Sequence, residues 1–151
     1  MGVFTRVVLL SLFGVAVALR GAAFSHDGDD GAGAGWERVE KAYRAGMAAA
    51  SSADERLACH ELRRAALAAL VERHYQAASS WLLPRAGLLS ALEEDQTKWR
   101  RMIDAMPRTT PDELDRLAHL YRDRLRALEA ITANADLQRT ADSRVRDIQS
   151  H

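Results

Sequence analysis

Hydrophobic residues between positions 36 and 131 recur at steps of three and four, the spacing of residues on one face of an α-helix. Breaks near residues 50, 84 and 107 divide this stretch into four segments, so the pattern predicts four amphipathic helices. The positions that define them are Trp36, Val39, Tyr43 and Met47, then Cys59, Leu62, Ala66, Leu70, His74, Ala77 and Trp81, then Leu89, Leu92, Gln96, Trp99, Ile103 and Met106, and finally Leu114, Leu117, Tyr121, Leu125, Leu128 and Ile131.

Residues with strong positional preferences set the expected helix ends. Ser52 and Glu55 have the spacing of a capping box, in which each side chain satisfies a free backbone amide at a helix start, so the second helix is expected over 53–83. Pro84 and Gly87 interrupt it because proline cannot donate to the preceding turn. A third helix is expected over 84–106. Thr110, followed by Pro111 and an acidic turn, opens a fourth that reaches about residue 133.

The composition supports an all-α fold. Hydrophobic residues make up 48% of the chain, charged residues 28% and aromatic residues only 6%. Alanine and leucine dominate, and they favour helices over strands. The sequence therefore predicts one domain over 36–134, a small antiparallel bundle of about four helices.

The two ends of the chain have different compositions. Residues 1–23 have the layout of a secretory signal peptide: Arg6, an apolar run over 7–19, and small residues before a cleavage point. The run is shorter than the ~20 apolar residues that span a bilayer. A retained membrane anchor and a mitochondrial presequence are the alternatives. Residues 24–35 are expected to form a flexible linker, and 135–151 a polar C-terminal tail or short helix. The signal peptide predicts a periplasmic or secreted protein.

Few residues in the sequence suggest a catalytic, metal-binding or redox role. Cys59 is the only cysteine, so no disulfide forms within one chain; a buried hydrophobic role is expected, and an intermolecular disulfide or reactive thiol is the alternative. The histidines lack metal-ligand spacing, and no glycine-rich phosphate loop or nucleophile–base pair is present. We therefore expect no metal, no cofactor and no enzymatic activity. Lys+Arg and Asp+Glu are each 21, and this balance argues against nucleic acid as a partner.

Two residues of the third helix, Gln96 and Trp99, lie on its apolar stripe. A buried amide must find hydrogen-bond partners, because leaving them unmade costs about 1–3 kcal/mol. We therefore expect Gln96 to form a hydrogen bond between helices, and Trp99 to anchor the core.

The order of residues from about Leu57 to Leu128 resembles the LprI-type domain of bacterial cell-envelope proteins. The residues that carry the resemblance are Cys59 at the start of a helix, Tyr75 farther along it, the Gln-x-x-Trp of Gln96 and Trp99, Asp104 after it, and Arg124 in the segment that leads to Leu128. The second cysteine of the family pattern is absent, since Met106 and Pro107 stand there. The resemblance therefore implies a divergent member without the family's disulfides.

Lysozyme inhibition is the activity that the resemblance implies. We expect an exported protein-binding module of the cell envelope, with a lysozyme as a candidate partner and a carboxylate surface to meet that basic enzyme: Glu93, Glu94, Asp95 and Asp104. The alternative is a structural helical subunit that forms homo-oligomers through its apolar seams. A membrane contact is expected only if the N-terminal segment is retained.

Overall fold

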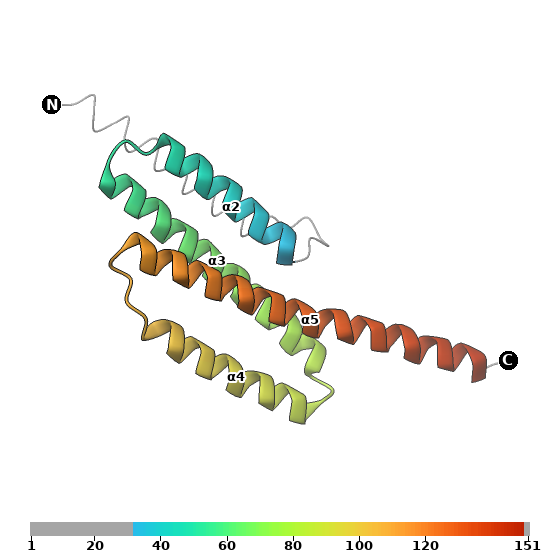
Figure 1. Cartoon of the computed structure of the whole chain (residues 1–151). Helices are drawn as coiled ribbons and strands as arrows, with labels where there is room; N and C mark the ends of the chain where they lie inside the picture. The colour runs from blue at the N-terminus through green and yellow to red at the C-terminus, as the bar shows by residue number, and fades with distance from the viewer. Residues whose placement is uncertain (1–31, 150–151) are drawn as a thin grey trace.

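The computed structural model describes the backbone of residues 32–149 and the side chains of residues 33–134. Four helices follow one another, α2 (Ala32–Ala49), α3 (Ala53–Leu82), α4 (Ala86–Asp104) and α5 (Pro111–Gln149), with no strand in the described range (Figure 1). The all-α bundle expected from the sequence is confirmed.

Helix α3 lies at the centre of the bundle. It shares its largest interface with α5, a smaller one with α2 and the smallest with α4, while α2 also touches α5. Successive helices run antiparallel, as expected, but α3 and α5 run in the same direction (Figure 1). Near the start of both, Arg63 Nη1 donates to Asp115 Oδ1 at 2.7 Å, and farther along Glu129 interacts electrostatically with His74. The largest interface of the bundle therefore joins two parallel helices.

Aliphatic side chains from all four helices form one core, in which leucines of α3 and α5 contribute the most volume. Removing such apolar surface from water is the main favourable term in folding. The largest fully buried hydrophobic side chains are Val39, Cys59, Leu67, Leu70, Val71, Leu114, Leu117, Leu125 and Leu128.

Both predicted N-caps are confirmed. The Glu55 amide donates to Ser52 Oγ at 3.2 Å, and the Ser52 amide donates to Glu55 Oε2 at 3.1 Å. At the start of α5, the Glu113 amide donates to Thr110 Oγ1 at 3.3 Å and the Thr110 amide donates to Glu113 Oε2 at 3.0 Å. Each pair satisfies two amides that the helix leaves free, which fixes where α3 and α5 begin.

The expected linker and tail differ from the structure. Helix α2 starts at Ala32, so residues 32–35 of the expected linker are helical. Gly35 is buried there, and a Cβ on it would lie 3.1 Å from Leu70 Cδ2, so the missing side chain lets α2 approach α3. Helix α5 continues through 135–149, which makes the expected tail a direct extension of α5 beyond the other helices (Figure 1). The expected signal peptide, 1–23, lies outside the described residues.

The buried face of α3 differs from the predicted stripe. Ala77 is exposed, whereas Leu67, Val71, Ala78 and Leu82 are buried. A central helix with three neighbours buries more than one stripe, so a single periodic face describes it poorly. Trp99 is half-buried at the edge of the core, which corrects the expectation of a central anchor. None of the described helices is long and apolar enough to cross a membrane.

Replacing Leu67 by alanine tests the importance of the α3 core. Leu67 is 0% exposed, whereas Leu57 on the same helix is 37% exposed. Because Leu67→Ala removes buried methyl groups and leaves a cavity, we expect it to lower the free energy of unfolding by about 2–5 kcal/mol. The matched variant Leu57→Ala should change it by only about 0.5 kcal/mol. Urea unfolding monitored by circular dichroism measures both, and equal effects would contradict this core.

Candidate functional site

Helix α4 is attached to the bundle by few buried side chains. Only Leu92, Gln96 and Ile103 are buried along its 19 residues. Gln96 is the polar one of the three and is 1% exposed. The position of α4 therefore depends on how a buried amide is satisfied.

Arg124 of α5 provides the partner of that amide. Its Nε and Nη2 donate to Gln96 Oε1 at 2.8 and 2.6 Å. A guanidinium group has donors only, so the amide oxygen must face Arg124 and the amide nitrogen must face away. The expected hydrogen bond between helices through Gln96 is confirmed, and it joins α4 to α5.

Aromatic and acidic groups surround this contact. Arg124, which is 9% exposed, also donates from Nη1 to Asp95 Oδ2 at 2.5 Å. Its guanidinium carbon lies 5.7 Å from the ring centre of Trp99, within range of a cation–π interaction. The Trp99 ring meets the ring of Tyr121 edge to face, with 5.4 Å between the centres. One arginine thus links an amide, a carboxylate and an indole.

A hollow of about 140 Å³ lies beside Gln96, between α3, α4 and α5. We call it the Gln96 hollow. Gln96 Nε2 is buried and has no hydrogen-bond partner. The residues that line the hollow are Ala68, Val71, Glu72, Gln96, Trp99, Arg100, Ile103, Asp104 and Tyr121.

Ion pairs form the rim of the Gln96 hollow. Arg100 Nη2 donates to Glu72 Oε2 at 2.5 Å, and its guanidinium carbon lies 5.4 Å from the ring centre of Tyr75. Burial disfavours ionisation of Glu72, but hydrogen bonds from Gln76 and Arg100 outweigh it and lower the pKa of this carboxyl group. Asp104 Oδ1 accepts from Arg108 Nη2 at 3.2 Å. The hollow therefore has aromatic and aliphatic walls and a charged edge.

The residues predicted from the sequence divide into two groups. Gln96, Trp99 and Asp104 line the hollow, Arg124 holds Gln96, and Tyr75 reaches the rim through Arg100. Cys59 lies about 24 Å from Tyr75 along α3, given a rise of ~1.5 Å per residue. It is 1% exposed, and burial, followed by the charge of Glu55, raises the pKa of its thiol. Its surroundings are those of a buried hydrophobic residue.

The four carboxylates of the expected acidic surface do not form one patch. Glu93, Glu94 and Asp95 are consecutive, so they point in directions about 100° apart around α4. Glu94 Oε1 lies 2.7 Å from Lys98 Nζ. Asp95 forms an ion pair with Arg124, and Asp104 forms one with Arg108. Three of the four carboxylates therefore already have a basic partner.

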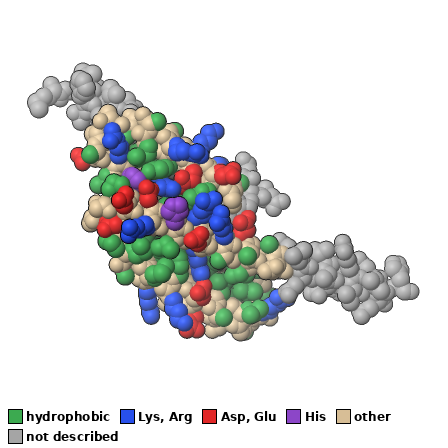
Figure 2. Space-filling model, in the orientation of Figure 1, with side chains coloured by type: hydrophobic (Ala, Val, Ile, Leu, Met, Phe, Trp, Pro, Cys, Tyr) green, Lys and Arg blue, Asp and Glu red, His purple; other side chains and the backbone are tan. Residues whose placement is uncertain are grey.

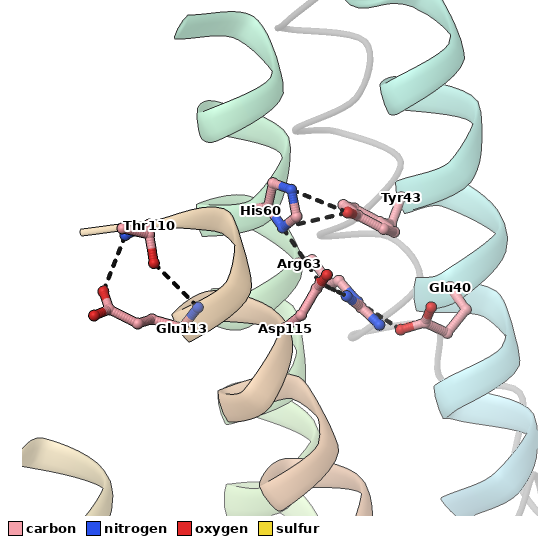
Figure 3. A network of polar contacts seen from close by, with 7 residues as sticks. All are labelled: Glu40, Tyr43, His60, Arg63, Thr110, Glu113 and Asp115. Atoms are coloured by element: carbon pink, nitrogen blue, oxygen red, sulfur yellow. Dashed lines mark hydrogen bonds and ion pairs between the residues drawn. The ribbon is translucent and has the colours of Figure 1, made fainter. Parts of the chain in front are cut away.

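A second polar cluster, which was not predicted from the sequence, joins α2, α3 and α5 (Figure 3). Arg63 is buried and donates to Glu40 Oε1 at 2.6 Å and to Asp115 Oδ1 at 2.7 Å. The Tyr43 hydroxyl lies 3.2 Å from His60 Nδ1. Burial and then the nearby Asp115 charge raise the pKa of Tyr43. The sequence does contain a signal for this cluster, because Arg63 is a charged residue among the apolar positions of α3.

The chemistry of both clusters is that of hydrogen bonding and charge pairing. Within residues 33–134 no three His, Cys, Asp or Glu side chains are placed to hold a metal ion. Arg63 meets two carboxylates and Arg124 meets one, each from another helix, which satisfies the buried charge and fixes the relative positions of those helices.

Replacing Arg124 by leucine tests its role in holding α4. The change leaves the buried Gln96 oxygen without a donor, so we expect the free energy of unfolding to fall by about 1–3 kcal/mol. Arg126→Leu, at an exposed position on the same helix, is the matched control and should change stability little. Chemical denaturation measures both, and a loss no greater than that of the control would contradict the proposed role of Arg124.

Comparison with known proteins gives no relative from which a function could be transferred. A scan against protein-family models, a search of curated proteins and a search of solved structures each find no match. The LprI-type resemblance therefore stays a prediction, and the functional argument depends on the geometry of the site.

Proposed function

We propose that this protein is an exported helical binding module of the cell envelope, and that it docks another protein at the Gln96 hollow. The composition of that region supports the proposal. Trp99, Tyr121 and Arg100 are of the three residue types most enriched among side chains that dominate binding energy at protein interfaces. They surround a recess with a charged rim, which is the usual arrangement of such interfaces.

The single observation that carries the proposal is the convergence of Gln96, Trp99 and Asp104 on one recess. These three residues come from the motif that resembles the LprI-type domain. The signal-peptide pattern of residues 1–23 supports the proposed export to the periplasm or the outside of the cell.

A lysozyme remains the candidate partner. Lysozymes are basic, so carboxylates on this surface would assist docking. The side chain of Asp104 is 78% exposed and that of Glu94 is 69% exposed. Their ion pairs with Arg108 and Lys98 lie at the surface, where solvent screens them, so a partner's basic side chain can replace either one at little cost. On the face seen in Figure 2, acidic and basic side chains are mixed with hydrophobic surface.

Lysozyme turnover tests this proposal. We expect the purified protein, added in large molar excess, to slow the hydrolysis of bacterial cell walls by a basic lysozyme. Asp104→Asn should weaken the inhibition by about fivefold, the effect of one exposed charge pair worth ~1 kcal/mol. Asp112→Asn, at an exposed position on α5, is the matched control. Unchanged turnover in the presence of the wild-type protein would exclude lysozyme as the partner.

A second candidate function is a structural subunit that forms homo-oligomers. An apolar groove of about 420 Å³ opens between the end of α3, the start of α4 and α5. Leu88 lines this groove and is 53% exposed. Exposed apolar recesses of this kind are common at contacts between subunits. Because Cys59 is buried, this candidate places the contact at the groove and not at a disulfide through Cys59.

Light scattering in solution tests self-association. If the groove joins two copies, the purified protein should have the mass of a dimer. Leu88→Lys should return it to a monomer, because a charged group would then enter the apolar contact. Ser90→Lys, also exposed on α4, should leave the dimer intact. A monomeric wild-type protein at high concentration would rule this candidate out.

A further inference from the structure

A groove of about 400 Å³ lies between α2 and α5, and we call it the α2–α5 groove. Two buried apolar side chains, Trp36 and Leu125, line it. The other lining residues are Gly33, Glu37, Glu40, Arg44, Arg122, Arg126 and Glu129. None of these residues lines the Gln96 hollow, so a ligand in this groove is separate from the protein partner proposed above.

Arg122 of the groove contacts an aromatic ring and not a carboxylate. Its guanidinium carbon lies 5.2 Å from the ring centre of Trp36, and within residues 33–134 it forms no ion pair. Other buried or half-buried arginines do pair with carboxylates: Arg63, Arg64, Arg108 and Arg124. A guanidinium group has five N–H donors, in a geometry that matches a carboxylate. Because Arg122 is only half-buried, a ligand carboxylate in the groove can reach those donors.

Two further arginines extend this basic region. Arg126 is exposed and lies one turn beyond Arg122, on the same face of α5. Like charges at this spacing slightly destabilise a helix, and an anion bound between them would remove the repulsion. On α2, Arg44 Nε donates to the backbone oxygen of Glu40 at 3.3 Å and meets no carboxylate of the described part of the chain. The groove therefore offers three guanidinium groups to an anion.

The acidic side chains of the groove differ in how far their charge is already compensated. Glu40 accepts a hydrogen bond from Arg63 at 2.6 Å (Figure 3). Glu37 and Glu129 form no ion pair with any side chain among residues 33–134. Glu129 does interact with His74, but burial lowers the pKa of that imidazole, so the ring is neutral at pH 7. The charges of Glu37 and Glu129 therefore stay available to a cation.

We propose that the α2–α5 groove binds a short zwitterionic peptide, of about two residues, through its two free ends. The carboxylate of the peptide meets Arg122 and Arg126, and its ammonium group meets Glu37 and Glu129. A simple anion would face like charge from the two glutamates, and a simple cation would face like charge from the three arginines. A ligand that carries both charges has a partner for each of them.

The size of the groove favours a dipeptide over a single amino acid. At roughly 30 Å³ for each water in the liquid, 400 Å³ holds about 13 waters, or a similar number of non-hydrogen atoms. Alanine has about six such atoms and alanylalanine about eleven, so the dipeptide fills most of the space. Its two charged groups are attached to Cα atoms about 3.8 Å apart, whereas an amino acid carries both on one Cα. This separation suits a groove whose acids and arginines do not pair directly.

Alanylalanine is the probe for this site, and nitrogen-15 NMR of the purified full chain is the measurement. The chain has three tryptophans, and of these only Trp36 lines the groove. We expect the peptide to shift the indole signal of Trp36 and to leave those of Trp81 and Trp99 in place. No response of Trp36 up to the solubility limit of the peptide would overturn the inference.

Three matched ligands test the need for both charges. N-acetyl-alanylalanine lacks the ammonium group and alanylalanine amide lacks the carboxylate, so each should bind about tenfold more weakly. Inorganic phosphate, an anion without an ammonium group, should also bind more weakly than the free dipeptide. Equal binding of the blocked peptides, or tighter binding of phosphate, would overturn recognition of a zwitterion.

Substitutions at exposed positions assign the two ends of the peptide. Arg126→Gln should weaken the binding of alanylalanine but not that of its amide, and Glu37→Gln should weaken the binding of alanylalanine but not that of its acetylated form. Gly33→Leu should weaken all binding by filling the groove, since a Cβ at Gly33 has no atom within 4 Å. Arg116→Gln, exposed on α5 outside the groove, is the control and should bind normally. Wild-type binding by the first three variants would mean that the peptide binds elsewhere, which overturns the inference.

Discussion

The packing of α3 against α5 is the contact on which the rest of this structure depends. The two helices provide most of the fully buried leucines, and they run parallel, so the chain must return along the bundle between them. Helix α4 makes that return on one side, and α2 covers the other side. The proposed site follows from this arrangement, because the Gln96 hollow lies where α4 meets the α3–α5 pair.

The space in the Gln96 hollow and its polar groups result from the way α4 is attached to the bundle. A helix held by many leucines would close against its neighbours and leave no space. Here Leu92 and Ile103 are buried toward the two ends of α4, and between them the amide of Gln96 meets Arg124. A polar contact has stricter geometry than an apolar one, since both groups must be aligned to avoid the cost of burial. The half-buried Trp99 and the unpaired Gln96 nitrogen are consequences of this packing.

Two buried arginines fix the relative positions of the helices. Arg63 joins α3 to Glu40 of α2 and to Asp115 of α5, and Arg124 joins α5 to α4. Such contacts add little net stability because burying each charge costs free energy, but they disfavour a shift of one helix along another, which would leave the charge unpaired. Leucine packing alone tolerates such shifts more easily.

Local features of the sequence account for the helices and for several of their ends. The three- and four-residue spacing defined four amphipathic segments, the capping residues Ser52 and Thr110 fixed two starts, and Gln96 on an apolar stripe predicted a contact between helices. These features are local, because spacing, capping and the cost of a buried amide act within a turn or two of the helix.

Which helices pack against each other depends on contacts between residues that are distant in the sequence. Periodicity shows which face of a helix is apolar, but it does not name the neighbour that covers that face. The parallel pairing of α3 and α5, the Arg63 cluster and the burial of Gly35 against Leu70 all join residues far apart in the sequence. The Gln96 hollow is of the same kind, since its walls come from three helices and its volume depends on how closely α4 approaches the other two.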